Sequence, residues 1–369
     1  MHIPFCAKKC SYCDFHFSTR FGAYREEMIL SIVKEIKQRR GEALKPLSSI
    51  YFGGGTPSLL TIEETSLLLK TIEEHYQRNK NIEVTLEVNP EDISKEKLRS
   101  WLNMGVNRLS IGLQSFKKED LNWMNRGHTD KDALSCVSFA REVGFTNISV
   151  DLMYGLPGLS QKEWKNHIDL VLESGVTHVS AYCLTVEKGT LLSSEIKKGN
   201  ISVPEDDAIE SQYNTLTSQL NNSGFEQYEV SNFAYNKLYS QHNSSYWKGV
   251  NYIGVGPSAH SFKEGYRRWN IANNPAYIRS LKMNCGYYEE EFLSQKDLWN
   301  ELFLTGFRTR WGVLKGKIND LGGFTTEETS LLEGYIKNHK IKELKEAYVL
   351  TDNGFLFADA LAQSFFRVQ

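Results

Sequence analysis

Cysteine is scarce in this chain, which has 6 cysteines among 369 residues. Three of them, Cys6, Cys10 and Cys13, are clustered, and the other three are scattered singly. Cysteines this sparse, with three clustered and three scattered, exclude a small secreted fold that is held together by a disulfide framework. The pattern favours a metal site in a reducing compartment, and we therefore expect a cytoplasmic protein.

Long apolar runs and an excess of charge of one sign are also missing. No run of about 18 or more apolar residues is present, so no membrane-spanning helix is expected, nor do the first residues have the pattern of a signal peptide. The net charge is −2, so no overall field draws the chain toward nucleic acid or an acidic membrane. The length and ordinary composition allow a large core plus a second, smaller domain.

Strand-like and helix-like segments alternate through the first 225 residues. Strands are expected at 2–5, 49–52, 82–88, 108–113, 147–153 and 178–185, and helices at 24–40, 63–77, 94–104, 130–143, 161–174 and 205–222. Such alternation implies parallel strands joined by right-handed crossovers. The number of these units falls short of the eight of a closed (β/α)₈ barrel. The sequence therefore predicts an α/β fold with a partial, open (β/α)₆ barrel.

The unusual residue clusters follow the carboxyl ends of these strands. The clustered cysteines follow the first strand and residues 53–57 the second, while residues 87–89, Gln114 and Asp151 with 155–157 end the next three. In such barrels the chemistry lies on the loops after the strands. We therefore expect all these clusters on one rim.

The character of the sequence changes near residue 289. Helical patterns at 298–306, 326–338 and 359–366, with a small strand pair in 342–350 and a turn at 351–354, predict a small C-terminal α+β, winged-helix-like domain. We divide the chain into the partial barrel at 1–225, a barrel-closing segment at 226–288 and the C-terminal domain at 289–369. No basic stripe marks a recognition helix, so no nucleic-acid partner is expected.

The most informative motif is Cys6-Ala-Lys-Lys-Cys10-Ser-Tyr-Cys13, close to the start of the chain. Cysteines at this spacing can hold three corners of a [4Fe–4S] cube, which leaves one iron without a protein thiolate. An open metal position is where chemistry takes place, as in catalytic zinc sites. Two other interpretations stay open from these residues alone: a zinc site that lacks one ligand, or three unrelated core cysteines.

Further motifs accompany the cysteines. They are His2-Ile-Pro-Phe, Gly53-Gly-Gly-Thr-Pro-Ser58, Glu87-Val-Asn-Pro90, Ser110-Ile-Gly-Leu-Gln-Ser-Phe116, Asn125-Arg126-Gly-His128 and Asp151-Leu-Met-Tyr-Gly-Leu-Pro157. In this order they resemble the radical S-adenosylmethionine (SAM) superfamily. Within it, they are most similar to the group of oxygen-independent coproporphyrinogen III oxidases and their relatives, the HemW family of haem chaperones. The resemblance covers essentially the whole chain.

The resemblance implies a radical SAM barrel with two cofactors. Cys6, Cys10 and Cys13 would hold a [4Fe–4S] cluster whose open iron binds SAM. The implied SAM contacts are Gly54, Gly55, Thr56, Glu87, Gln114, Arg126 and Asp151. Glycines allow close backbone approach, a carboxylate suits ribose hydroxyls, and a guanidinium suits a carboxylate.

Two residues near the cysteines are expected to shield the cluster, namely Tyr12 and Phe15. One family feature is absent from the chain as given. The family carries a tyrosine just ahead of the His-Ile-Pro-Phe run, and here Met1 stands before His2. The sequence leaves open whether this start is truncated.

Three features separate oxidase from chaperone. The oxidases have an extra cysteine two residues after the third cluster cysteine, where this chain has Phe15, and an N-terminal extension that is absent here. The run His242-Asn-Ser-Ser-Tyr246-Trp247 resembles the His-Asn-x-x-Tyr-Trp motif that is associated with haem binding in the chaperones. Imidazole is a good axial ligand for haem iron, and aromatic rings can stack on a porphyrin. A core histidine satisfied by hydrogen bonds is the other interpretation of His242, and His260 is a weaker ligand candidate.

The sequence therefore predicts a haem chaperone that binds a [4Fe–4S] cluster, SAM and haem and hands haem to acceptor apo-proteins. The first alternative is an oxidase that decarboxylates two propionates of coproporphyrinogen III. The second is a radical SAM enzyme with an unrelated substrate. Peripheral association with the inner face of the membrane would suit haem delivery, although no basic amphipathic helix supports it.

Overall fold

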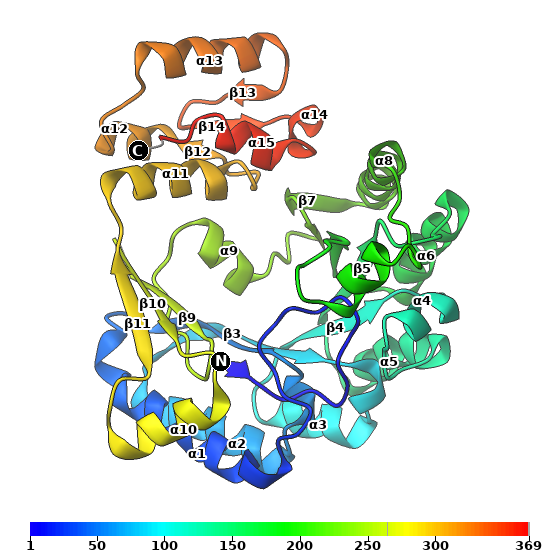
Figure 1. Ribbon diagram of the computed structural model, residues 1–369, viewed down its shortest axis with the longest axis vertical. Coiled ribbons are helices and arrows are strands. Elements are labelled where there is room, and N and C mark those ends of the chain that lie inside the picture. The colour runs from blue at the N-terminus through cyan, green and yellow to red at the C-terminus, as the bar shows by residue number, and fades with distance from the viewer. Residues whose placement is uncertain (264, 368–369) are drawn as a thin grey trace.

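The computed structural model describes residues 1–263 and 265–367, and its largest element is an eight-stranded sheet (Figure 1). Its strands are, in spatial order, β1 (His2–Ile3), β2 (Leu47–Gly54), β3 (Arg78–Val88), β4 (Arg108–Gln114), β5 (Asn147–Tyr154), β6 (His178–Cys183), β8 (Asn232–Tyr235) and β7 (Phe225–Glu229). Strands β1 to β6 are parallel, and β8 is antiparallel to both β6 and β7. The predicted α/β fold with six parallel strands is confirmed, and the β7–β8 hairpin extends the sheet beyond it.

Helices follow the parallel strands, and most of them lie on the outer side of the sheet (Figure 1). They are α1 (Arg25–Gln38), α2 (Ile62–His75), α3 (Lys95–Asn103), α4 (Lys118–Trp123), α5 (Asp130–Val143), α6 (Gln161–Ser174), α7 (Leu191–Lys197) and α8 (Asp206–Asn222). Helices α5 and α6 begin and end at the predicted residues, because both have a capping box at the start and a left-handed glycine, Gly144 or Gly175, at the end.

The two faces of the parallel strands have different surroundings. In β4, Leu109 and Ile111 are buried in the main hydrophobic core, which also contains residues of the surrounding helices. Ser110 lies between them and donates a hydrogen bond to Asp151 of β5. Since neighbouring residues of a strand point to opposite faces, the polar side chains gather on the inner face of the barrel.

The segment after the barrel contains structure that the sequence did not predict. Helix α9 (Gln241–Trp247) is followed by β9 (His260–Lys263), β10 (Tyr266–Asn270), α10 (Asn274–Met283) and β11 (Tyr288–Phe292). The last three strands form a separate antiparallel sheet in the order β11-β10-β9. The predicted domain boundary between residues 225 and 226 falls on β7.

The C-terminal region has its own hydrophobic core, which includes Trp299, Phe303 and Phe365. Its elements are α11 (Gln295–Gly306), β12 (Val313–Leu314), α12 (Lys315–Asp320), α13 (Thr326–Lys337), β13 (Ile341–Glu343), β14 (Ala347–Leu350), α14 (Asp352–Phe355) and α15 (Ala358–Gln363). The predicted turn at 351–354 is wrong: these residues begin α14, and the strand pair turns at 344–346 instead. Within the described residues, no helix is long and apolar enough to cross a membrane.

The C-terminal region lies against α9 and the β7–β8 hairpin (Figure 1). Backbone hydrogen bonds join Val230 to Arg308 and Arg310 to Tyr228. The ammonium of Lys248, which follows α9, lies 3.9 Å from the ring centroid of Trp311. Helix α9 is therefore held between the barrel and the C-terminal region.

Candidate functional site

The three clustered cysteines lie on the loop that follows β1. Backbone hydrogen bonds from Cys6 to Ser18 and from Ser18 to Pro4 close this loop at its base, and a third from Ser11 to Met124 ties it to the end of α4. Cys6 is buried, Cys10 and Cys13 are partly exposed, and none of the three forms a disulfide. The thiols are thus available to a ligand at the rim of the barrel.

The surroundings of these thiols disfavour their charged form. Among the described residues, no group of three or more His, Cys, Asp or Glu side chains is placed to hold a metal ion. Burial raises the pKa of Cys6 to about 11 and also raises that of Cys13. Thiolates at these positions therefore need added positive charge, which iron would supply.

Arg126 brings positive charge to the same loop. Its guanidinium donates hydrogen bonds to the Gly112 carbonyl over 2.6 Å and to Asn89 Oδ1 over 2.9 Å, and one amino group lies 3.7 Å from Cys10 Sγ. Its Nε is buried and has no hydrogen-bond partner. An orphaned donor beside a thiol is what a site for an anionic cluster or a carboxylate ligand requires.

The glycine run at the end of β2 allows the cysteine loop to approach the sheet. Gly54 has a φ of 107°, and a Cβ there would lie 2.8 Å from the His2 ring. A Cβ on Gly55 would lie 2.6 Å from the Phe5 carbonyl oxygen. Thr56 follows, and its hydroxyl donates to Cys6 Sγ over 3.4 Å. The missing side chains therefore make room for the loop itself, and SAM contact by these residues stays a prediction.

Replacing Gly55 by alanine is expected to lower the free energy of unfolding by about 1–3 kcal/mol, because the new methyl group would overlap backbone that cannot move freely. Urea denaturation measures this change. Gly41→Ala is the matched control, since a Cβ there meets nothing within 4 Å. That variant should change stability by less than about 1 kcal/mol. Equal effects of the two substitutions would contradict the close approach of the loop.

Two carboxylates predicted to contact SAM lie on the inner face of the barrel. Burial raises the pKa of Glu87 to about 7 and that of Asp151 to about 6. Tyr51 donates a hydrogen bond to Glu87 over 2.6 Å, and Ser110 donates one to Asp151 over 3.3 Å. Both carboxyl groups are therefore held in place and can accept or donate hydrogen bonds near neutral pH.

The remaining predicted contact, Gln114, ends β4 with a φ of 68°, next to an irregularity in the β4–β5 register. Asn89 was missed as a candidate, although it lies within one of the quoted motifs. Its side chain accepts from Arg126 and donates to Thr56 Oγ1 over 3.4 Å. Asn89 therefore connects the glycine run to the arginine beside the cysteine loop.

His242 lies away from the cysteine loop, on α9. The carboxylate of Glu83 accepts hydrogen bonds from the backbone N–H groups of Gln241 and His242, both over 2.9 Å, and so fixes the start of this helix on β3. The imidazole Nδ1 lies 3.1 Å from Ser49 Oγ, and Nε2 lies 2.9 Å from Tyr246 Oη. Burial lowers the pKa of His242 to about 3, so the imidazole is neutral, as an iron ligand must be.

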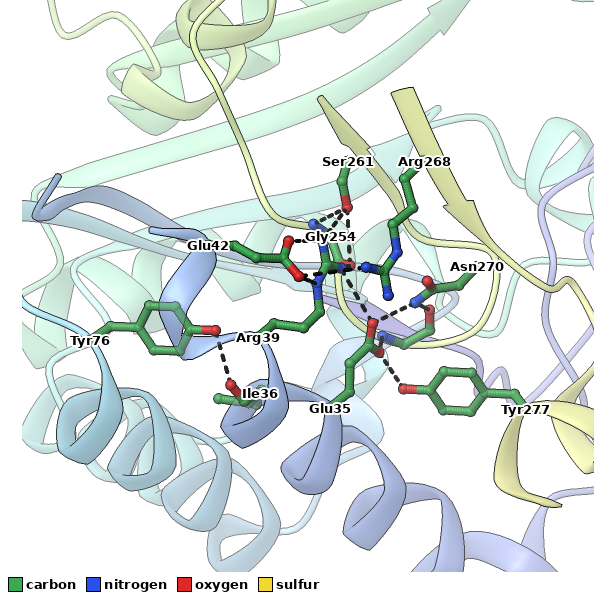
Figure 2. A network of polar contacts seen from close by, with 11 residues as sticks. Glu35, Ile36, Arg39, Glu42, Tyr76, Gly254, Ser261, Arg268, Asn270 and Tyr277 are labelled. Carbon is green, nitrogen blue, oxygen red and sulfur yellow. Dashed lines mark hydrogen bonds and ion pairs between the residues drawn. The ribbon is translucent and has the colours of Figure 1, made fainter. Parts of the chain in front are cut away.

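A cavity of about 1240 Å³ opens beside His242. Its aromatic lining comes from Tyr51, Tyr76, Tyr246, Tyr252, Phe262, Tyr266 and Phe292. Another wall is polar, and Figure 2 shows Arg39, Glu42, Ser261 and Arg268 meeting there. The volume exceeds that of an ordinary small-ligand pocket, and the lining suits a large, flat, partly charged molecule.

Three side chains have surroundings other than those expected. Trp247 packs its ring against the guanidinium of Arg308, 5.3 Å away, and does not line the cavity. His260 is exposed at the start of β9 and does not line it either. Phe15 is 67% exposed and lines a surface hollow together with Cys13, so shielding of the cluster by this ring stays a prediction. Of the three ring-bearing residues in the run from His242 to Trp247, His242 and Tyr246 line the cavity.

Comparison with known proteins places the chain among described families. Residues 1–171 match the model of the radical SAM superfamily. The haem chaperone HemW of Bacillus subtilis is 32% identical over 378 residues, which cover 99% of this chain and 98% of that protein. HemW of Lactococcus lactis is 30% identical over 366 residues, which cover 99% of this chain and 96% of that protein.

A second kind of relative is longer than this chain. The mitochondrial radical S-adenosyl methionine domain-containing protein 1 of Danio rerio is 40% identical over 261 residues, which are 70% of this chain and 59% of that protein. Among solved structures, coproporphyrinogen III oxidase HemN of Escherichia coli has a TM-score of 0.84 at 21% identity, and the match covers 99% of this chain and 88% of HemN. This likeness shows that the fold extends over the whole chain.

Proposed function

The chain belongs to the HemW family within the radical SAM superfamily, and we propose that it is a haem chaperone that binds a [4Fe–4S] cluster, SAM and haem and passes haem to acceptor proteins. The observation that carries the proposal is the neutral imidazole of His242 beside a cavity of about 1240 Å³. Relatives named as haem chaperones match nearly the whole chain, which supports the same function here.

The residues of the rim would hold the first two cofactors. Cys6, Cys10 and Cys13 are the cluster ligands, and Arg126 lies where it can balance the charge of the ligand set. Gly54, Gly55, Thr56, Glu87, Gln114 and Asp151 complete the proposed SAM site. A reduced cluster with bound SAM would supply one-electron chemistry, while the chain itself positions the two groups and limits the access of water.

His242 and the aromatic side chains of the cavity would hold haem. The imidazole would bind the haem iron, and Tyr252 and Phe262 offer apolar surface to the porphyrin. Lys45 and Lys263 are exposed at the same cavity, where their ammonium groups can pair with propionates. An open cavity suits a protein that must release its haem to another protein.

The proposed partners are haem and haem-accepting proteins in the cytoplasm, with peripheral contact at the inner face of the membrane. Nucleic acid does not fit as a partner. The order helix, strand, helix, helix, strand, strand in the C-terminal region is that of a winged helix, but α13 carries Glu327, Glu328 and Glu333 against a single Lys337. That surface would repel phosphates.

The oxidase remains the second candidate, because a solved structure that shares this fold over the whole chain is a coproporphyrinogen III oxidase. Anaerobic incubation of the reconstituted protein with coproporphyrinogen III, SAM and a reductant distinguishes the two functions. Formation of protoporphyrinogen would contradict the chaperone proposal and support the oxidase. We expect no product.

An anaerobic titration of cluster-reconstituted protein with hemin, followed by Soret absorbance, tests haem binding itself. We expect the wild type to bind hemin stoichiometrically. His242→Ala should lower the affinity for hemin by more than roughly tenfold, which is the loss in metal affinity when a residue hydrogen-bonded to a ligand is removed. His260→Ala is the matched control, because this exposed histidine does not line the cavity. Unchanged binding by His242→Ala would remove the proposed ligand, and no binding by the wild type would refute the function.

A further inference from the structure

Tyr51 on β2 lies between the two proposed binding sites. Its hydroxyl donates a hydrogen bond to Glu87 Oε1 over 2.6 Å, on the SAM side. Its ring stacks on the imidazole of His242 with 4.4 Å between the ring centroids and 15° between the planes. The same side chain lines the large cavity. One residue thus touches a residue of each site.

The sequence of β2 produces this arrangement. Ser49, Tyr51 and Gly53 share one face of the strand, because alternate residues point the same way. Ser49 meets His242 Nδ1, and Tyr51 covers the face of the same ring. A Cβ on Gly53 would lie 2.8 Å from the Tyr51 ring and 3.0 Å from Glu87 Oε1. The glycine therefore leaves the space in which tyrosine and glutamate meet.

Both ring nitrogens of His242 have hydrogen-bond partners in this arrangement, so neither is free to bind iron. Ser49 occupies Nδ1, and the hydroxyl of Tyr246 lies 2.9 Å from Nε2. A haem iron can take the imidazole only after one nitrogen is released. While Tyr51 is anchored by Glu87, its stacked ring restricts the rotation of His242 that would release Nε2 from Tyr246.

We propose that Tyr51 couples the SAM site to the haem site, so that SAM bound at Glu87 strengthens the binding of haem at His242. This inference rests on the proposed function. Hydroxyl or amino groups of SAM compete with Tyr51 for the Glu87 carboxylate. Without its hydrogen bond to Glu87, the Tyr51 ring can move. His242 can then rotate, and its Nε2 can leave the hydroxyl of Tyr246. The reverse effect is required as well: haem must strengthen SAM binding by the same factor.

The affinity for hemin is measured with and without SAM, by Soret titration under anaerobic conditions, for the wild type and for Tyr51→Phe. For the wild type we expect SAM to raise the affinity by at least about fivefold, the lower end of ordinary coupling. Tyr51→Phe keeps the ring but has no anchor. It should bind hemin without SAM about as tightly as SAM-loaded wild type does, and SAM should change its affinity little.

Tyr246→Phe is the second variant, because it frees Nε2 directly and leaves the Tyr51–Glu87 contact intact. It should raise hemin affinity without SAM, and SAM should then change the affinity little, because the Nε2–Tyr246 contact that SAM is proposed to release is already gone. A wild-type ratio retained in Tyr51→Phe, or a wild-type affinity that SAM does not raise, would overturn the coupling and leave the haem site standing. If the wild type binds no hemin, or His242→Ala binds it equally well, the proposed function fails first.

Discussion

Cys10→Ala should leave the reconstituted protein almost without bound iron and sulfide. Three thiols hold three corners of a cube, and the fourth iron already lacks a protein ligand, so loss of one thiol leaves only two protein anchors. The affinity for the cluster should fall by more than the roughly 10- to 100-fold that is lost when a residue hydrogen-bonded to a metal ligand is removed, because Cys10 is itself a proposed ligand. Iron and sulfide content, with the visible absorbance of the cluster, measures it after anaerobic reconstitution.

Cys285→Ala provides the matched control for this prediction. Cys285 is a free, exposed cysteine near the end of α10, far along the chain from the cysteine loop. Its loss should leave the cluster content unchanged, which separates the cluster ligands from a general effect of cysteine replacement. Full cluster content in Cys10→Ala would contradict the assignment of the loop cysteines, whatever the control shows.

The rim of the barrel could be predicted because one rule of topology determines it. Parallel strands end at the same edge, so residues after β1, β2 and the third and fourth strands must converge. The structure brings Thr56 to Cys6, Asn89 to Thr56, and Arg126 to Cys10. Strand order was sufficient to bring these loops to one rim: the first two contacts join the ends of neighbouring strands, and the third joins the loop after β4 to the loop after β1.

The surroundings of His242 could not be predicted from the sequence. Its contact with Ser49 joins residues 193 positions apart and depends on how α9 folds back onto β2 and β3. The β7–β8 hairpin was missed because both strands are short and lack regular alternation. At 351–354, the sequence Thr-Asp-Asn-Gly is typical of a turn, yet the packing of Phe355 in the C-terminal core makes it the start of a helix.

The largest stability effect outside the rim is expected for Glu35→Ala, at about 3–5 kcal/mol of unfolding free energy. Glu35 is fully buried on α1 and accepts hydrogen bonds from the Gly256 N–H, Asn270 and Tyr277, besides its ion pair with Arg39 (Figure 2). Alanine would leave these donors buried without an acceptor, and each such group costs about 1–3 kcal/mol.

Glu42→Ala separates burial from the mere loss of an ion pair. Glu42 also pairs with Arg39, at 2.6 Å, but its side chain is 43% exposed. Water can therefore replace its carboxylate, and we expect a loss of no more than about 1 kcal/mol. Urea denaturation of both variants gives the comparison. Equal losses would show that the charge of Arg39 determines the stability of this region. A much larger loss for Glu35→Ala would show that the contacts of Glu35 join α1 to β10 and α10, and β10 carries Arg268 of the polar wall of the cavity.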